Sequence, residues 1–117
     1  MRIIAWSTLQ DFVRNRVEPR LQKIVSEHLD AWNKLVSKAR WANSAELKRQ
    51  VGSASIVSSD RAVFNIKGND FRLVVIVRYR YGRVYIVWIG THQEYDRIDV
   101  TRVKFIKERY ADPTDSN

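Results

Sequence analysis

A chain of 117 residues with 44% hydrophobic and 29% charged residues has the size and composition of one folded domain, which excludes a disordered polypeptide. Its 21 lysine and arginine residues outnumber 13 acidic ones, and the net charge of +8 favours a polyanionic partner: RNA, DNA, anionic lipid or an acidic protein. The alternative is that this charge only keeps the domain soluble. There is no cysteine, which excludes a disulfide framework and a thiolate-bound metal.

The chain opens with a short predicted strand and a short predicted helix. Residues 2–6 are mostly apolar and predict the strand. This run is too short for a signal peptide or a membrane span, so we expect a cytoplasmic protein with no membrane partner. Ser7 or Thr8 is the expected cap of a helix that ends near residue 15, because a hydroxyl oxygen accepts a hydrogen bond from a free backbone N–H.

A longer helix is predicted over residues 19–39. Pro19 suits its first turn, where the missing N–H leaves no hydrogen bond unmade. Apolar residues recur here at helical spacing and predict one buried stripe. The stripe consists of Leu21, Ile24, Val25, His28, Trp32, Leu35, Val36 and Ala39. We interpret His28 as a core or helix-surface residue, and Trp32 and Trp41 as packing residues. Another helix is expected over residues 45–50, capped by Asn43 or Ser44.

After Gly52 the apolar residues alternate with a period of two, which predicts strands. The expected strands cover residues 54–57, 61–67, 71–79 and 84–89. Gly68 and Asn69 tolerate positive φ and predict a hairpin turn, and Gly82 predicts a further turn. The unbroken apolar run 73–77 is typical of a central strand that is covered on both faces.

The order of these elements predicts an α+β domain. The N-terminal strand and the helices are expected to pack on a mostly antiparallel sheet of four to five strands. We expect one domain over residues 1–110 and a flexible C-terminal tail over residues 111–117. Asp99 is the expected cap of a C-terminal helix over residues 100–109, although the β-branched residues there leave a strand as the alternative.

Several kinds of catalytic site have no signature in this chain. There is no Gly-rich phosphate loop before a Lys-Ser or Lys-Thr pair and no Gly-x-Ser-x-Gly elbow. Two histidines, His28 and His92, lie far apart in the sequence and have no cysteine to join them, which argues against structural zinc. We therefore expect neither a metal nor a cofactor.

The segment 90–96 concentrates the residue types that could carry chemistry. It follows a strand and places an imidazole, a phenol and two carboxylates close together. Cleavage of RNA without a metal needs a base for the ribose 2′-hydroxyl, cations for the phosphate and an acid for the leaving 5′-oxygen. His92 can act as acid or base, and Tyr95 can donate a proton or stack on a base. Arg72, Lys67 and Arg61 lie near strand ends and could hold phosphate.

Each of these residues also has a purely structural interpretation. His92 could close the end of the strand through a hydrogen bond to backbone, and Tyr95 could pack between the sheet and a helix. Asp96 could cap a helical turn or form a surface ion pair. Arg78 and Arg80 flank the turn at Gly82 and could form a solvated edge that discourages aggregation between sheets.

Two blocks of the chain resemble the HigB toxin family. They are residues 63–74, which include Phe-Asn-Ile-Lys-Gly-Asn at residues 64–69, and residues 90–99, which begin with Gly-Thr-His-Gln-Glu-Tyr-Asp. The opening residues 2–5, Trp41, and the segments 45–48 and 53–55 are also similar to this family, so the resemblance extends to about residue 100. The chain departs from the family pattern after Asp99, where the segment that follows is longer and more basic.

This resemblance implies a RelE-like fold and an mRNA interferase, an endoribonuclease that acts on mRNA at the ribosome without a metal. It also implies a cognate HigA-type antitoxin with a helix-turn-helix, through which the complex binds operator DNA. The residues in the matching blocks are Lys67, Asn69, Arg72, His92, Tyr95 and Asp96. As catalytic residues we expect His92, Tyr95, Arg72 and Lys67. As RNA contacts we expect Arg61, Asn69, Asp96, Arg78 and Arg80.

Two other functions stay open at this stage. A catalytically inactive RNA- or DNA-binding module would have the same charge, and its affinity would fall steeply with salt while the RNA stayed intact. A RelE-like toxin could also act on a target other than RNA, such as DNA gyrase. The basic segment 100–110 could contact ribosomal RNA or an acidic antitoxin, or form a packed terminal helix.

Overall fold

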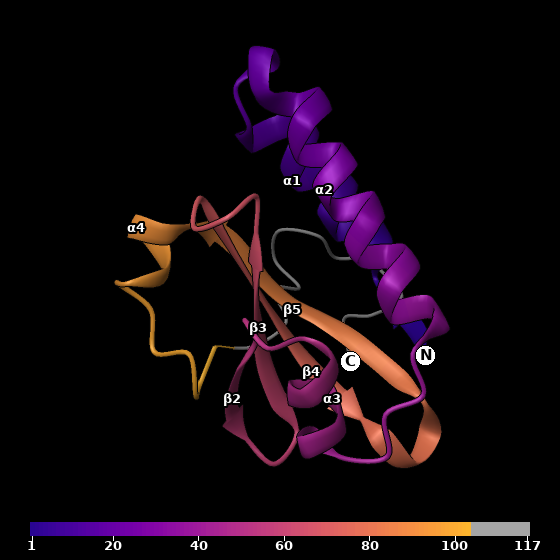
Figure 1. Ribbon diagram of the computed structural model, residues 1–117. Coiled ribbons are helices and arrows are strands. Elements are labelled where there is room, and N and C mark those ends of the chain that lie inside the picture. The colour runs from indigo at the N-terminus through magenta and orange to yellow at the C-terminus, as the bar shows by residue number, and fades with distance from the viewer. Residues whose placement is uncertain (104–117) are drawn as a thin grey trace, which may run out of the picture.

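Five strands form one sheet in the computed structural model, which describes residues 1–103 (Figure 1). The strands are β1 (Arg2–Ile4), β2 (Ser55–Ser58), β3 (Arg61–Ile66), β4 (Phe71–Arg78) and β5 (Arg83–Thr91). Their spatial order is β1-β5-β4-β3-β2, in which β1 is parallel to β5 and the other pairs are antiparallel. The α+β class and the mostly antiparallel sheet are therefore confirmed.

The helices lie between the first strand and the rest of the sheet in the sequence. They are α1 (Trp6–Arg16), α2 (Pro19–Lys38) and α3 (Ser44–Gln50), and a short helix α4 (His92–Tyr95) follows the last strand. Because β1 pairs with β5, the chain crosses over through α1 and α2 before it enters the meander. Figure 1 shows α1 and α2 lying along one another, with α4 at the far side of the sheet. No helix within residues 1–103 is long and apolar enough to cross a membrane.

The buried face of α2 is rotated by about one residue relative to the predicted stripe. Its buried residues are Val25, Leu29, Trp32 and Val36. Ile24 and Leu35 keep more than a third of their surface exposed, and His28 is exposed as well. The prediction was wrong for Ile24 and Leu35, because they flank the contact line, and it missed Leu29, which continues the helical spacing from Val25. His28 is therefore a helix-surface residue.

The start of α1 also differs from the prediction. β1 ends at Ile4, and α1 begins directly at Trp6 after Ala5, whose φ of 72° places it in the left-handed region. No side chain caps this helix, so the predicted cap at Ser7 or Thr8 is wrong. The sharp turn at Ala5 replaces a capping loop and brings the first turn of α1 directly against the core.

The cap of α3 is confirmed. The Asn43 side chain accepts a hydrogen bond of 3.0 Å from the backbone N–H of Glu46. The Glu46 carboxylate accepts one from the backbone N–H of Ala42, also at 3.0 Å. The first bond satisfies a donor that the helix itself leaves free, and the second satisfies the N–H of the residue before the cap.

Both faces of β4 are covered, as the apolar run predicted. Leu73, Val75 and Val77 belong to the core under α1 and α2. Val74 lies on the other face, in a smaller cluster with Val63, Val87 and Trp88. Successive residues of a strand point to opposite faces, so an unbroken apolar run needs two covers. The second cover is α4 together with the segment that follows it, from which Tyr95, Ile98, Val100 and Val103 pack on this cluster.

Several predicted boundaries move by one or two residues. β4 ends at Arg78, and Tyr79–Tyr81 form a 3₁₀ turn where the strand was expected to continue. β5 continues through Gly90 to Thr91, so Gly90 does not end it. Asp99 accepts hydrogen bonds from Thr101, and residues 100–102 form a turn. The rest of the predicted C-terminal helix and the predicted tail lie outside the described residues.

Candidate functional site

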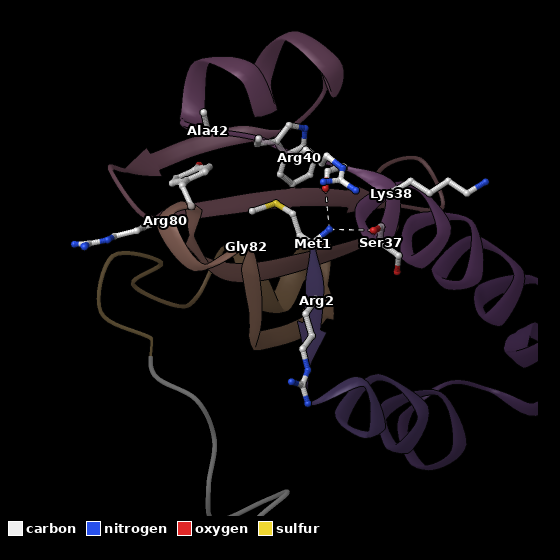
Figure 2. A pocket seen from close by; sticks show the side chains of 11 residues that line it. Met1, Arg2, Ser37, Lys38, Arg40, Ala42, Arg80 and Gly82 are labelled. Atoms are coloured by element: carbon white, nitrogen blue, oxygen red, sulfur yellow. Dashed lines mark hydrogen bonds between the residues drawn. The ribbon is translucent and has the colours of Figure 1, made fainter.

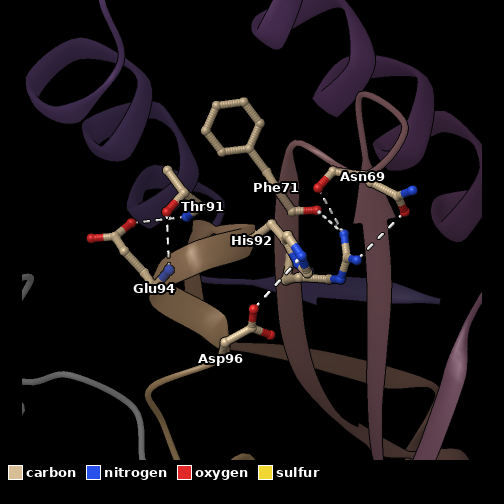
Figure 3. A network of polar contacts seen from close by, with 7 residues as sticks. Asn69, Phe71, Thr91, His92, Glu94 and Asp96 are labelled. Carbon is tan, nitrogen blue, oxygen red and sulfur yellow. Dashed lines mark hydrogen bonds and ion pairs between the residues drawn. The ribbon is translucent and has the colours of Figure 1, made fainter.

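Three segments meet at one end of the sheet and bring most of the predicted site residues together. Lys67 and Asn69 lie in the turn after β3, Arg72 lies near the start of β4, and His92 begins α4 at the end of β5. Arg72 pairs in register with Gly90, and the backbone N–H of His92 donates to the carbonyl of Asp70 at 3.0 Å. The network at this end of the sheet is drawn in Figure 3.

The turn after β3 exists because two successive residues accept left-handed backbone angles. Lys67 has φ of 54° and Gly68 has φ of 62°. The prediction placed this conformation at Gly68 and Asn69, so the turn begins one residue earlier than expected. The backbone N–H of Asp70 closes it on the carbonyl of Lys67 at 3.1 Å. The Lys67 ammonium donates to the Asp70 carboxylate at 2.6 Å, on a partly exposed surface.

Arg72 is held by neutral groups. Its guanidinium donates to the backbone oxygens of Asn69 at 3.1 Å and Phe71 at 3.3 Å, and to the Asn69 side-chain oxygen at 3.4 Å. It also lies over the ring of Tyr95, 6.0 Å from the centroid. Within residues 1–103 these contacts leave its positive charge without a carboxylate partner. The side chain is thus oriented, and its charge is available to an anion.

His92 and Tyr95 share one side of α4. Residues three or four apart face the same way on a helix, so His92, Tyr95 and Asp96 lie together. The His92 Nε2 is 3.6 Å from a carboxylate oxygen of Asp96, and both side chains are about half exposed, at 46% and 60%. Within the described residues no backbone group bonds to the imidazole. The predicted alternative, in which His92 closes the strand end, is therefore not what the structure has.

A capping box fixes α4 to the end of β5. The Thr91 hydroxyl accepts from the backbone N–H of Glu94 at 3.1 Å, and the Glu94 carboxylate accepts from the backbone N–H of Thr91 at 2.8 Å. The same carboxylate accepts from Arg16, the last residue of α1, at 2.5 Å. Burial raises the pKa of Glu94, but the hydrogen bonds from Thr91 and the Arg16 charge outweigh it and hold the pKa below its usual value.

Close packing beneath α4 depends on Gly90. The indole of Trp88 lies over it, and a Cβ at position 90 would come within 2.5 Å of that ring and 2.9 Å of the Glu94 carboxylate. Trp88 in turn contacts Tyr95, with ring centroids 6.3 Å apart. Trp88 therefore supports the aromatic ring on which Arg72 rests.

Sequence reasoning missed the supporting residues Arg16, Trp88, Gly90 and Glu94. The pattern Thr-x-x-Glu at residues 91–94 is the signature of a capping box and would have predicted α4. No local pattern could have found Arg16, because it lies 78 residues away from Glu94.

Three predicted RNA contacts lie elsewhere. Arg61 and Arg78 lie at the other end of the strands, where β3 begins and β4 ends. The Arg61 guanidinium donates to the carbonyls of Val100, at 3.2 Å, and Val103. Arg78 pairs with Asp60 at 2.6 Å. Arg80 lies in the 3₁₀ turn with its guanidinium 5.8 Å from the centroid of the Tyr81 ring. The structure does not bring these three to the His92 end.

In the part of the chain that the structure describes, no group of three or more histidine and acidic side chains is arranged to hold a metal. The polar groups of the site are cations, an imidazole, a phenol and the carboxylates of Asp70 and Asp96. They can bind an anion and exchange protons with it.

The α+β domain, with its five-stranded mixed sheet and helical crossover, is consistent with the fold of a RelE-like toxin. The family model of the HigB toxin, the RelE-like toxic component of a toxin-antitoxin system, matches residues 25–98. The chain therefore belongs to the HigB toxin family, as its sequence motifs predicted, and an antitoxin is its partner. The match contains all six site residues from Lys67 to Asp96. No curated protein matches the chain.

Proposed function

We propose that this toxin is an endoribonuclease that cleaves mRNA at the ribosome without a metal and acts in the cytoplasm. The observation that carries the proposal is the oriented guanidinium of Arg72, without a carboxylate partner among the described residues, beside the helix that presents His92 and Tyr95. A cation next to two proton-exchanging groups is what transesterification of an RNA phosphodiester requires.

In the proposed reaction the ribose 2′-oxygen attacks the adjacent phosphorus while the bond from phosphorus to the 5′-oxygen breaks. His92 takes the proton of the 2′-hydroxyl, and the carboxylate of Asp96 stabilises the imidazolium that forms. The Tyr95 hydroxyl gives a proton to the leaving 5′-oxygen. The products are a 2′,3′-cyclic phosphate and a 5′-hydroxyl, so the atoms balance without water.

Arg72 and Lys67 would stabilise the charge that grows on the phosphate oxygens. Arg72 can bind two oxygens at once because its guanidinium is planar. Lys67 is paired with Asp70 on a partly exposed surface, where an ion pair is weak, so a phosphate can replace that partner. Asn69 orients Arg72 through its carbonyl and its side chain.

We infer that the antitoxin is of the HigA type and covers the basic surface of the toxin. A partner of complementary charge would associate rapidly with a domain of net charge +8 and would exclude RNA from it. Binding of operator DNA would then be a property of the antitoxin and its helix-turn-helix.

The test is induction in bacteria, with the mRNA 5′ ends mapped afterwards. Wild type is compared with His92→Ala and with His28→Ala, a matched control on the exposed surface of α2. Wild type and His28→Ala should arrest growth and cut mRNA at defined codon positions. At equal protein level His92→Ala should cut at least about a hundredfold more slowly.

Three results would overturn parts of this proposal. Folded wild type that neither arrests growth nor cuts RNA would leave a binding module. Arrest with intact RNA and DNA-damage markers would indicate a DNA target. Cleavage that persists in His92→Ala would remove His92 from the reaction and move the proton transfer to Tyr95 or Lys67.

A further inference from the structure

A second basic site lies on the side of the molecule away from α4. A hollow of about 860 Å³ opens between β1, the connection from α2 to α3, and the turn at residues 79–82 (Figure 2). Its lining includes four cationic side chains, Arg2, Lys38, Arg40 and Arg80. No aspartate or glutamate is among the lining residues, and none of these cations has an ion-pair partner within residues 1–103. The positive charge is therefore not neutralised locally.

The four cations surround the hollow without converging on one point. Figure 2 shows Arg2, Lys38 and Arg80 extending in different directions, while Arg40 lies over the Met1 amino group. That amino group donates to the carbonyls of Ser37 and Ala39, at 3.0 and 2.8 Å. A single small anion could contact only one or two of these side chains at a time. Cations spread around an open hollow fit a chain of phosphates.

The turn beside the hollow adds an aromatic surface. Tyr81 is 65% exposed, which is unusual for a ring of this size, and the Arg80 guanidinium lies over it. Unpaired RNA bases stack on aromatic rings and on the planes of arginine side chains. A tyrosine can also pack in a protein interface, but every nucleotide of an RNA strand offers both a phosphate for the cations and a base that can stack on the ring. The combination of Tyr81 with the cations therefore favours RNA over an acidic protein.

This surface is distinct from the candidate cleavage site. The turn follows Arg78 at the end of β4, whereas Phe71 and Arg72 begin that strand at the cleavage end. Eight residues of strand span about 23 Å. The two sites share no residue, and an RNA that occupies both must extend along the length of the sheet.

We propose that the hollow lined by Arg2, Lys38, Arg40 and Arg80, together with the exposed Tyr81, is a second RNA-binding surface. It takes the phosphate backbone and an unpaired base of an RNA strand, and it contributes affinity without taking part in cleavage. The proposal concerns binding alone, so it holds or fails independently of the proposed ribonuclease activity.

The experiment measures binding of the full chain to a fluorescein-labelled single-stranded RNA of about sixteen nucleotides by anisotropy, over a series of salt concentrations. The variants are Arg40→Ala/Arg80→Ala and Tyr81→Ala. The matched control is Arg14→Ala/Lys23→Ala, which removes the same charge from exposed positions of α1 and α2 away from the hollow. Circular dichroism establishes that every variant is folded.

The double variant at the hollow should raise the Kd about tenfold or more and reduce the salt slope by roughly 1.4, because two phosphate contacts are lost. Tyr81→Ala should raise the Kd at least about fivefold with little change in the salt slope, since stacking is not ionic. The control should change the Kd less than about twofold. An equal loss in the control would overturn the proposal, because net charge alone would then explain binding.

A polyglutamate peptide serves as the competing probe. If the hollow variants lose affinity for polyglutamate and keep their affinity for RNA, the surface takes an acidic partner and the proposal is wrong. If they lose affinity for RNA and keep their affinity for polyglutamate, the surface takes RNA, as proposed.

Discussion

The two ends of strand β4 both carry arginine, but in different surroundings. At the α4 end, cations lie among a histidine, a tyrosine, carboxylates and backbone carbonyls, and Arg72 is held by three hydrogen bonds. At the opposite end, the hollow is lined by four cations and no carboxylate among the described residues, and its side chains spread apart. A reaction requires groups that are oriented and can exchange protons, whereas affinity for a polyanion requires only charge.

The two ends of β4 also differ in how tightly their residues are packed. The α4 end contains the most crowded glycine, Gly90, and an interaction between Arg16 and Glu94 that ties it to α1. At the opposite end, Gly82 has no atom within 4 Å of the position of a Cβ. We therefore expect substitutions at the α4 end to affect both stability and chemistry, and substitutions of the cationic side chains at the hollow to affect binding alone.

The largest effect is expected for Arg72→Ala. Loss of one oriented charge that stabilises a transition state typically slows a reaction by about a hundredfold to a thousandfold. The matched control is Arg78→Ala at the other end of β4, which should retain at least about half the activity. Cleavage is measured on programmed ribosomes with purified protein. Equal cleavage rates for Arg72→Ala and Arg78→Ala would show that the position of an arginine along β4 does not determine its role in the reaction.

The next largest effect is expected for Gly90→Ala, which should lower the free energy of unfolding. The added methyl group would clash with Trp88, and overpacking of this kind typically costs about 1–3 kcal/mol. Gly52→Ala has open space and no positive φ, so it should change the free energy of unfolding by less than about 1 kcal/mol. Urea unfolding measures both. A neutral Gly90→Ala would mean that Trp88 moves freely and does not support Tyr95.

Lys67→Ala should slow cleavage by about tenfold, less than Arg72→Ala, because the lysine is a point charge on an exposed surface and makes fewer hydrogen bonds to phosphate. Asp70→Asn is the companion variant. It releases Lys67 from its partner and should not slow cleavage. A larger loss in Asp70→Asn than in Lys67→Ala would mean that the carboxylate has a role of its own.

The smallest effect is the acid sensitivity of α4. The folded pKa of Glu94 lies below its ordinary value of 4.5, so its contribution to stability is complete above that pH and is lost as the pH falls through the lowered value. The contribution is below about 1 kcal/mol because the carboxylate is exposed to solvent screening. Between about pH 5 and 3, wild type should lose stability more steeply than Glu94→Gln. If the free energies of unfolding of wild type and Glu94→Gln fell equally steeply with pH, this prediction would be contradicted.

Much of the fold could be predicted because local patterns determine it. The apolar run 73–77 indicated a strand covered on both faces, and Asn43 indicated the start of α3. The left-handed Ala5 could not be predicted, because alanine has no preference for that conformation and only packing of α1 imposes it. The stripe of α2 was misplaced because a wide apolar face does not reveal which of its residues meet the sheet.

The candidate site was predicted in part for the same reason. Lys67, Asn69, Arg72, His92, Tyr95 and Asp96 lie in two short blocks, and pairing of β4 with β5 brings these together. Arg61, Arg78 and Arg80 have the same chemistry but lie at the far end of the strands. Sequence alone reports the residue type, whereas the register of the sheet decides the end at which it lies.

The most direct test of cleavage by His92, Tyr95 and Arg72 is the chemistry of the RNA ends after reaction with the purified toxin. Attack by the 2′-hydroxyl leaves a 5′-hydroxyl on the downstream fragment and a 2′,3′-cyclic phosphate on the upstream one. These ends are expected from wild type and His28→Ala, at a rate that falls at least about a hundredfold in His92→Ala. A 5′-phosphate on the downstream fragment, or uncut mRNA with folded wild type on programmed ribosomes, would contradict the proposed mechanism.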